Sequence, residues 1–519
     1  MNKYLGRHRL TWMLRSIRLS LFSPRPHQLR RSMSTYESLS REELITRLTE
    51  LEGATSNPQP PTKSQSTEPP KKKNPKKEAK AFNFAAFPRR KIALKFCYHG
   101  WDYNGLAVQS EPTPLPTVEE VLFDALCESR LIEREQGFEG CDWSRCGRTD
   151  RGVSAAGQVV ALWVRSTIKP PLATDKEDVP PEGETVAADG EVTEGASPSK
   201  PGSTPAEQEL RYILILNRIL PPSIRVLAWS PVSNDFSARF NCRRRHYKYF
   251  FNSLPLPSPP LDFDCLRDAA SRLVGEHDFR NFCKLDGSKQ IERYDRRIDR
   301  AEVSILRKGD TIRDGTVHLG DLFVLDLVGS AFLWHQVRHV MAILLLIGHG
   351  LEQPSVIDAL LNTNPEKPHP DSSIPLVPAR PIYEMADGLP LILWDCGFDE
   401  TDVQWRADVS TDEDYAATAS GFLWQQIHGE YSRSLVHTAL HQHFLEAASL
   451  YHNPPTDTRG IAHVNIGGGQ KRRTKKYVPL LKRKRGDTVD VVNERWRNGP
   501  RAAKKAEKFL KIEETDEVE

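Results

Sequence analysis

The sequence predicts an α+β fold, in which helices pack on a largely antiparallel sheet. Residues 91–98 alternate in polarity and are followed by Gly100, which is typical of a strand. Thr117 and Glu120 have the spacing of a capping box, so an amphipathic helix is expected to begin there. Residues 157–164 indicate a buried strand. A strand, a helix, a loop and a second strand in this order form half of a ferredoxin-like unit.

The following part of the chain again mixes helical and strand patterns. The spacing of apolar residues, together with Gly and Pro residues at the ends of segments, predicts helices at 207–220, 262–274 and 331–347. The same signals predict strands at 224–229, 321–328 and 388–394. The apolar stripe of the helix at 331–347 includes Leu333, Trp334 and Val337. This helix is no membrane span, because His335, Arg338 and His339 occupy its first half.

Length and composition predict a folded body with long polar extensions. The 519 residues are only 38% hydrophobic and include 38 prolines. We expect a basic, mostly disordered extension at 1–88, with a short helix at 40–52. The two halves of the folded body are expected at 89–242 and 243–400. A helical extension at 401–470 should pack on the body, and a basic then acidic tail should follow at 471–519. Residues 169–206 are expected to be a disordered insertion.

Basic clusters near both ends of the chain suggest localisation signals or RNA-binding arms. The first 34 residues contain seven arginines and no acidic residue, which fits either a mitochondrial presequence or a disordered basic extension that initiation at Met33 would bypass. Residues 71–77 and 471–485 are candidate nuclear localisation signals or RNA-attracting arms, and solvated linkers have the same composition. We therefore expect a protein of the cytoplasm and nucleus, with a possible mitochondrial pool.

The eight cysteines show no pair with Cys-x-x-Cys spacing. Neither a zinc site nor a disulfide framework is indicated by that spacing. Reduced thiols in an intracellular protein are the default expectation.

Asp150 is the leading candidate for a catalytic residue. It lies between Gly147 and Gly152, with Arg148 two residues before it and Arg151 directly after it. Glycines permit positive φ and close approach of a ligand, and guanidinium groups favour an ionised carboxylate and attract phosphate. A surface turn with a local Arg–Asp ion pair is the alternative.

Residues 235–250 place basic and aromatic side chains on one predicted strand. Tyr247 and Tyr249 share one face, whereas His246 and Lys248 share the other. Cations neutralise phosphates and rings stack on bases, so this pattern suits a nucleic acid. An edge strand with half-buried tyrosines has the same pattern.

Arg338 lies in the first turns of a strongly apolar helix, where an unpaired cation is costly to desolvate. Asp150 is a reasonable partner for it from elsewhere in the chain. The alternative is a side chain that extends to solvent.

Several of these segments resemble one family. Gly147 to Ala155 resembles the catalytic motif of the TruA-type tRNA pseudouridine synthases, with Arg151 and Ser154 where the bacterial pattern has Ala and His. Five other segments resemble further sequence blocks of this family, in the same order along the chain. They are residues 100–109, 235–250, 276–284, 332–338 and 388–394. The likeness is greatest to the eukaryotic branch that modifies uridines 38 and 39 of the tRNA anticodon arm.

The resemblance implies a fold, an activity and roles for four residues. It implies two ferredoxin-like halves whose antiparallel sheets join across a central cleft, and usually a homodimer. Asp150 would be the catalytic residue, Tyr247 would pack on the target uracil, Arg338 would pair with Asp150, and Arg148 would fill the space of the flipped base or hold the backbone. The substrate would be tRNA, with no cofactor, metal or membrane. A non-catalytic tRNA-binding or tRNA-folding protein on the same fold is the alternative, whereas the signature of a zinc nucleobase deaminase is absent from the sequence.

Overall fold

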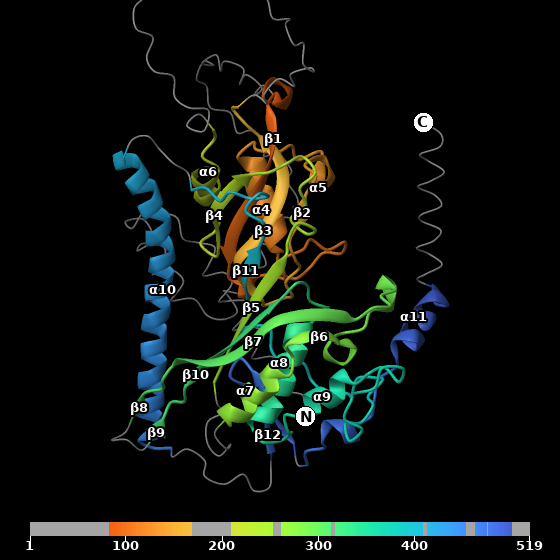
Figure 1. Cartoon of the computed structure of the whole chain (residues 1–519). Helices are drawn as coiled ribbons and strands as arrows, with labels where there is room; N and C mark the ends of the chain where they lie inside the picture. The colour runs from red at the N-terminus through yellow and green to blue at the C-terminus, as the bar shows by residue number, and fades with distance from the viewer. Residues whose placement is uncertain are drawn as a thin grey trace, which may run out of the picture. The chain divides into compact units, whose positions relative to one another are not determined.

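The computed structural model describes residues 82–168, 209–252, 261–312, 317–407, 413–452, 462–474 and 476–500 (Figure 1). All of them belong to the unit Ala81–Glu519. The expected helix at 40–52, the expected insertion at 169–206 and both N-terminal basic segments lie outside the described residues.

A nine-stranded sheet organises this part of the chain, with its strands in the order β4-β1-β3-β11-β5-β10-β7-β6 and with β2 paired to β3. The pairs are antiparallel, except that β11 runs parallel to β3. The strands are β1 (Arg89–Tyr98), β2 (Ser144–Arg145), β3 (Ser154–Arg165), β4 (Ile224–Pro231), β5 (Arg244–Asn252), β6 (Gly275–Asp278), β7 (Asp295–Arg307), β10 (Leu322–Gly329) and β11 (Leu391–Gly397). Two further hairpins pair β8 (Thr311–Ile312) with β9 (Val317–His318) and β12 (Ala462–Gly467) with β13 (Gln470–Thr474).

Helices accompany both halves of the sheet (Figure 1). They are α4 (Val118–Glu128), α5 (Gly137–Gly140), α6 (Tyr212–Ile219), α7 (Phe263–Ser271), α8 (Gln336–Gly348), α9 (Val356–Leu361), α10 (Glu413–Ser449) and α11 (Val489–Arg497). Short 3-10 turns lie at Phe84–Ala86, Gly100–Asp102, Arg280–Phe282, Gly287–Lys289 and Leu480–Lys482.

The first half of the sheet has the predicted strand–helix–strand order. The capping box of α4 is confirmed: Glu120 N donates to Thr117 Oγ1 at 3.3 Å, and Thr117 N donates to Glu120 Oε2 at 2.7 Å. These two bonds satisfy amide groups that a helix start leaves free. The α+β fold class is confirmed, and β11 joins the two halves by pairing with β3 on one side and β5 on the other.

The second half confirms the alternation predicted for residues 244–252. Tyr247, Tyr249 and Phe251 are buried on one face of β5, while His246 and Lys248 are only partly buried on the other. The apolar body of α8 is almost wholly buried, so this helix belongs to the core.

The predicted helix at 331–347 begins five residues later, at Gln336. His335 precedes it with φ of 63°, a left-handed conformation that a continuous right-handed helix does not contain. Leu333 N donates to Gln336 Oε1 at 2.8 Å, which ties the segment before the helix to its first residue. Trp334 therefore lies before the helix, is 44% exposed and is not part of a buried stripe. The helix predicted at 207–220 is likewise shorter, at Tyr212–Ile219.

The C-terminal region differs from the expected tail. The hairpin β12–β13 spans the predicted boundary at residue 470. Beyond it, Leu480 and Val489 are buried, and Asn493 Nδ2 donates to Ile291 O at 3.1 Å. Buried apolar side chains and a buried amide contact make residues 476–497 part of the folded body.

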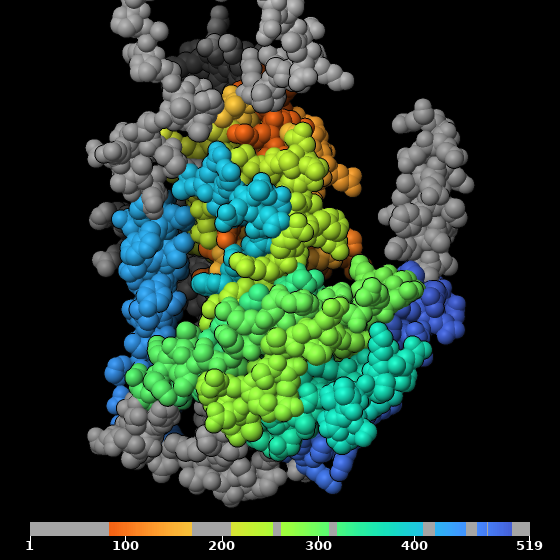
Figure 2. All heavy atoms as spheres, in the orientation of Figure 1, coloured from red at the N-terminus to blue at the C-terminus, as the bar shows by residue number. Residues whose placement is uncertain are grey.

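The long helix α10 lies within the range of the expected extension (blue in Figure 2), and from residue 421 onward most of its large apolar side chains are exposed. Leu423 packs against the core, whereas Trp424, Tyr431 and Phe444 are 59–64% exposed. Among the described helices, including the long helix α10, none is both long enough and apolar enough to span a membrane.

Candidate active site

Asp150 lies on the loop between β2 and β3, and hydrogen bonds fix both ends of this loop. Cys146 N donates to Val159 O at 2.9 Å, and Gln158 Nε2 donates to Gly147 O at 3.0 Å. The turn closes where Val153 N donates to Asp150 O at 3.1 Å. The carboxylate is thus presented by a short turn on a rigid strand.

A second loop packs directly on the Asp150 loop. Leu106 N donates to Thr149 O at 3.2 Å. A Cβ at Gly100 would lie 2.0 Å from Val153 O, and one at Gly105 would lie 2.9 Å from Thr149 O. The two backbones approach too closely for a side chain, which explains the glycines in the block at 100–109.

Two cationic or potentially cationic groups from the start of α8 face the carboxylate. Arg338 Nη1 lies 3.5 Å from Asp150 Oδ2, and His335 Nε2 lies 3.3 Å from the same oxygen. Arg338 Nε donates to Ala386 O at 2.8 Å, so the loop before β11 holds the guanidinium in place. The expected contact between Arg338 and Asp150 is present in the structure.

All three side chains are largely removed from water. The exposed fractions are 27% for Asp150, 15% for Arg338 and 13% for His335. Electrostatic attraction is stronger at such positions than between fully exposed groups. The carboxylate nevertheless keeps enough exposure to meet a ligand.

Sequence reasoning did not assign His335 to the site. It occupies the left-handed position before α8, where a non-glycine residue is uncommon and often marks a functional site. The sequence contained one signal, namely that His335 lies only three residues before Arg338.

Arg148 and Arg151 are exposed beside Asp150. The ion pairs of Asp150 among the described residues are with His335 and Arg338, so the alternative of a purely local Arg–Asp pair is not what the structure shows. The flanking guanidinium groups therefore remain available to an anionic ligand.

Tyr247 is buried on β5, with its ring edge-on to Phe332 at a centroid distance of 5.0 Å. Burial raises the pKa of the Tyr247 phenol well above its usual range, so the group is a neutral hydroxyl at physiological pH. Phe332 comes from the segment just before α8, which links Tyr247 to the surroundings of His335.

Cations and exposed rings also meet near the site. Lys284 Nζ lies 4.3 Å from the centre of the Trp334 ring, and Lys284 N donates to Trp334 O at 2.9 Å. Trp101 is 59% exposed, and its Nε1 donates to Leu389 O at 3.2 Å. Exposed rings suit stacking on bases, and the Lys284 ammonium suits contact with a phosphate.

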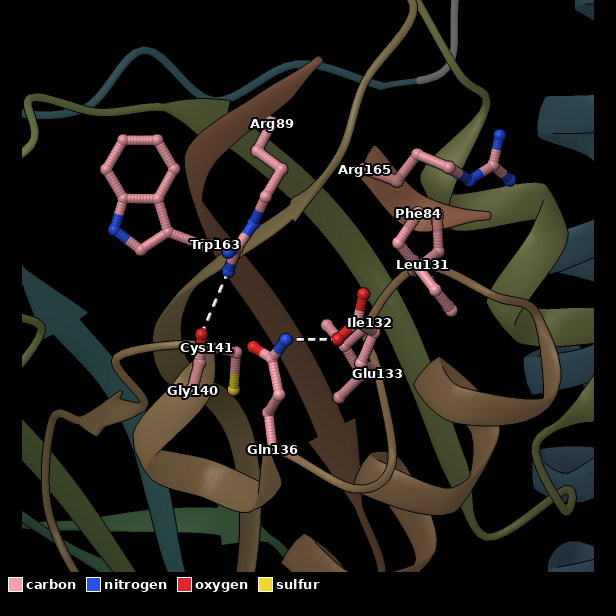
Figure 3. A pocket seen from close by; sticks show the side chains of 10 residues that line it. All are labelled: Phe84, Arg89, Leu131, Ile132, Glu133, Gln136, Gly140, Cys141, Trp163 and Arg165. Atoms are coloured by element: carbon pink, nitrogen blue, oxygen red, sulfur yellow. Dashed lines mark hydrogen bonds between the residues drawn. The ribbon is translucent and has the colours of Figure 1, made fainter. Parts of the chain in front are cut away.

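Two hollows lie away from Asp150. The one in Figure 3 has a volume of about 30 Å³, enough for a water molecule, and is lined by residues such as Arg89, Cys141 and Trp163. A larger one of about 330 Å³ is lined by Arg244, His246, Arg300, Val328, Asp395 and Gly397. Neither is lined by a residue of the Asp150 loop.

Comparisons with known proteins agree with this geometry. A family model described as tRNA pseudouridine synthase matches residues 269–399. A tRNA pseudouridine(38/39) synthase of Saccharomyces cerevisiae is 37% identical over 475 residues, which cover 89% of this chain and 92% of the yeast protein. The chain belongs to the tRNA pseudouridine synthase family. This family member is also 41% identical over 352 residues to a mouse tRNA pseudouridine(38/39) synthase, covering 67% of this chain and 63% of the mouse protein. It is 29% identical over 276 residues to a tRNA pseudouridine synthase A of Methanosarcina mazei, covering 52% of this chain and 76% of the archaeal one.

Proposed function

We propose that this protein isomerises uridine to pseudouridine in the anticodon stem-loop of tRNA, at positions 38, 39 or both. One observation carries the proposal. Asp150 lies in the loop that resembles the family's catalytic motif, and its half-buried carboxylate is 3.5 Å from the guanidinium of Arg338. The names of the yeast and mouse relatives support the choice of positions.

The reaction breaks the N1–C1′ glycosidic bond, turns the uracil and forms a C5–C1′ bond. The proton of C5 is lost and N1 gains one, so neither an oxidant nor a reductant is needed. Asp150 acts as a carboxylate in either of two routes, by adding to the ring or sugar or by removing the 2′ proton. Both routes need an ionised oxygen with access to the nucleotide.

The neighbouring residues have separate roles in this proposal. Arg338, held by Ala386 O, pairs with the carboxylate of Asp150 and orients it. Tyr247 supports the uracil as a neutral phenol, and the exposed Arg148 fills the vacated stack or holds the backbone. Taking the base out of the stem costs a few kcal/mol, which contacts of this kind offset.

Release of tritium from tRNA labelled at uridine C5 tests the proposal. We expect the wild-type protein to release tritium and Asp150→Asn to release none, while tRNA affinity changes little because the side chain keeps its size. Asp124→Asn is the matched control, since that carboxylate is 62% exposed on α4. A wild-type protein that binds tRNA but releases no tritium would establish the non-catalytic alternative instead.

We further propose that the protein is a homodimer joined through α10. Trp424, Ile427, Tyr431 and Leu435 are exposed at spacings of three or four residues and form one stripe on this helix. A second copy of the same stripe would cover them. Light scattering should give twice the 58.8 kDa mass of one chain, and Tyr431→Glu should give the single mass.

For localisation, we propose the cytoplasm and nucleus with a mitochondrial pool. The basic segments at 71–77 and 471–485 and the arginines of the first 34 residues support it. Imaging of a fluorescent fusion before and after replacement of each segment tests the three compartments separately.

A further inference from the structure

Three cysteines from distant parts of the chain meet in the interior. The sulfur atoms of Cys146, Cys242 and Cys396 all lie within 4.8 Å of one another. The residues are 2%, 7% and 3% exposed, respectively. Within the described ranges, no other group of three His, Cys, Asp or Glu side chains has this ligand-like closeness.

Each cysteine belongs to a different structural segment. Cys146 is the first residue of the Asp150 loop, and Cys242 lies two residues before β5. Cys396 lies on β11 and is paired in register with Arg245 of β5. The cluster therefore lies where the Asp150 loop meets the two strands that join the halves of the sheet.

The spacing suits a metal ion bound by three sulfurs. A Zn–S bond is about 2.3 Å long, so three sulfurs around one ion lie about 4 Å apart. The observed limit of 4.8 Å requires only a small contraction around the ion. Three cysteines that meet only through core packing need not bring all three sulfurs this close together.

A fixed cation next to the cluster is suited to offset the charge of thiolates. Arg245 Nη2 donates to Cys146 O at 3.0 Å, and its Nη1 donates to Ser330 O at 2.6 Å. These carbonyl contacts hold the guanidinium beside the sulfurs. Three thiolates around a divalent or monovalent cation leave a net negative charge, which a neighbouring guanidinium offsets in part.

We propose that Cys146, Cys242 and Cys396 bind one thiophilic d10 metal ion, of the Zn²⁺ or Cu⁺ class. Sulfur donors select these ions over harder cations. Three thiols lose three protons to solvent as three metal–sulfur bonds form, and no electron is transferred. The ion fastens the start of the Asp150 loop to β11 and to the segment that leads into β5, so its role is structural.

The test uses the full-length protein, reduced and freed of metal with a chelator, and then titrated separately with Zn²⁺ and with Cu⁺. Metal content after desalting and the ultraviolet absorption of metal–thiolate bonds report binding without reference to isomerase activity. We expect one ion per chain for at least one of the two cations and a rise in Tm on binding.

Single substitutions locate the site. Cys242→Ser should weaken binding at least tenfold and abolish the absorption, whereas Cys283→Ser, also at a buried cysteine, should leave both unchanged. Asp150→Asn should bind the metal like the wild type, which separates this inference from the proposed reaction. Failure of the wild-type protein to retain either cation would overturn the proposal, and so would equal retention by Cys242→Ser.

Discussion

Replacing Arg338 by Gln tests the central contact of the site. The substitution removes the positive charge 3.5 Å from Asp150 Oδ2 but leaves a side chain that still donates hydrogen bonds. His335 Nε2, at 3.3 Å from the same oxygen, stays in place. The carboxylate therefore keeps one neighbour and loses its permanent cation.

The expected loss follows from the geometry. Two unit charges about 4 Å apart interact by about 4 kcal/mol at an effective dielectric constant of about 20. A hydrogen bond to a charged group contributes about 1.5–3 kcal/mol in net terms, and the two groups here are only 15% and 27% exposed. We take a loss of about 2–3 kcal/mol, which corresponds to a rate about 30- to 150-fold lower.

Single-turnover tritium release from C5-labelled tRNA gives this rate, and filter binding gives the tRNA affinity. We expect the rate of Arg338→Gln to fall within that range with little change in affinity. Arg338→Lys keeps the charge but loses the contact of Nε with Ala386 O. Its rate should therefore lie between the rates of the wild type and of Arg338→Gln. An unchanged rate with weakened tRNA binding would refute the reasoning, because Arg338 would then hold phosphate rather than Asp150.

The remaining predictions concern the surroundings of the site. His335→Asn keeps a residue that tolerates positive φ but shortens the side chain, so tritium release should slow about tenfold with Tm nearly unchanged. Glu119 is fully buried and accepts from Trp143 Nε1 and Arg145 Nε, so Glu119→Gln should lower the free energy of unfolding in urea by about 3 kcal/mol. Burial and the nearby Arg380 lower the pKa of His339 from 6.5 to about 2, so its contribution to stability is complete above pH 6.5 and is lost as pH falls. Unfolding at pH 7 and pH 5 should differ by about 2 kcal/mol more in wild type than in His339→Gln.

Each of these has a distinct control. His335→Gly should match Asn in stability and be equally slow, so a normal rate for Gly would exclude a role for the imidazole. Glu120→Gln, which keeps the capping box of α4, should cost well under about 1 kcal/mol. For His339, an acid-side slope that is the same in wild type and variant would show that other groups carry the pH dependence.

Local patterns in the sequence predicted the elements that depend on neighbouring residues. The capping box at Thr117 and the alternation around Tyr247 are determined within a few residues, and both were predicted correctly. The contact between Asp150 and Arg338 joins segments that are far apart in the chain, and the family resemblance was needed to strengthen its prediction. The catalytic and binding roles of these residues stay predictions.

Other features depend on tertiary contacts that no local pattern contains. His335 adopts a left-handed conformation because the chain must turn from the Phe332 segment into α8 beside the Asp150 loop. The cysteine cluster draws on three segments, so a search for adjacent ligands such as Cys-x-x-Cys could not find it. The exposed apolar side chains of α10 have the same helical spacing as the buried apolar side chains of a core helix. Only the structure shows that they are exposed.

The position of β11 has a consequence for synthesis on the ribosome. Residues 391–397 pair with both β3 and β5, so the edges of these two strands stay open until that segment has left the exit tunnel. In a nascent chain shorter than this, the strand that joins the half carrying Asp150 to the half carrying Arg338 is still missing. A chain released before that segment is complete would therefore carry two unpaired strand edges, which are ready templates for aggregation.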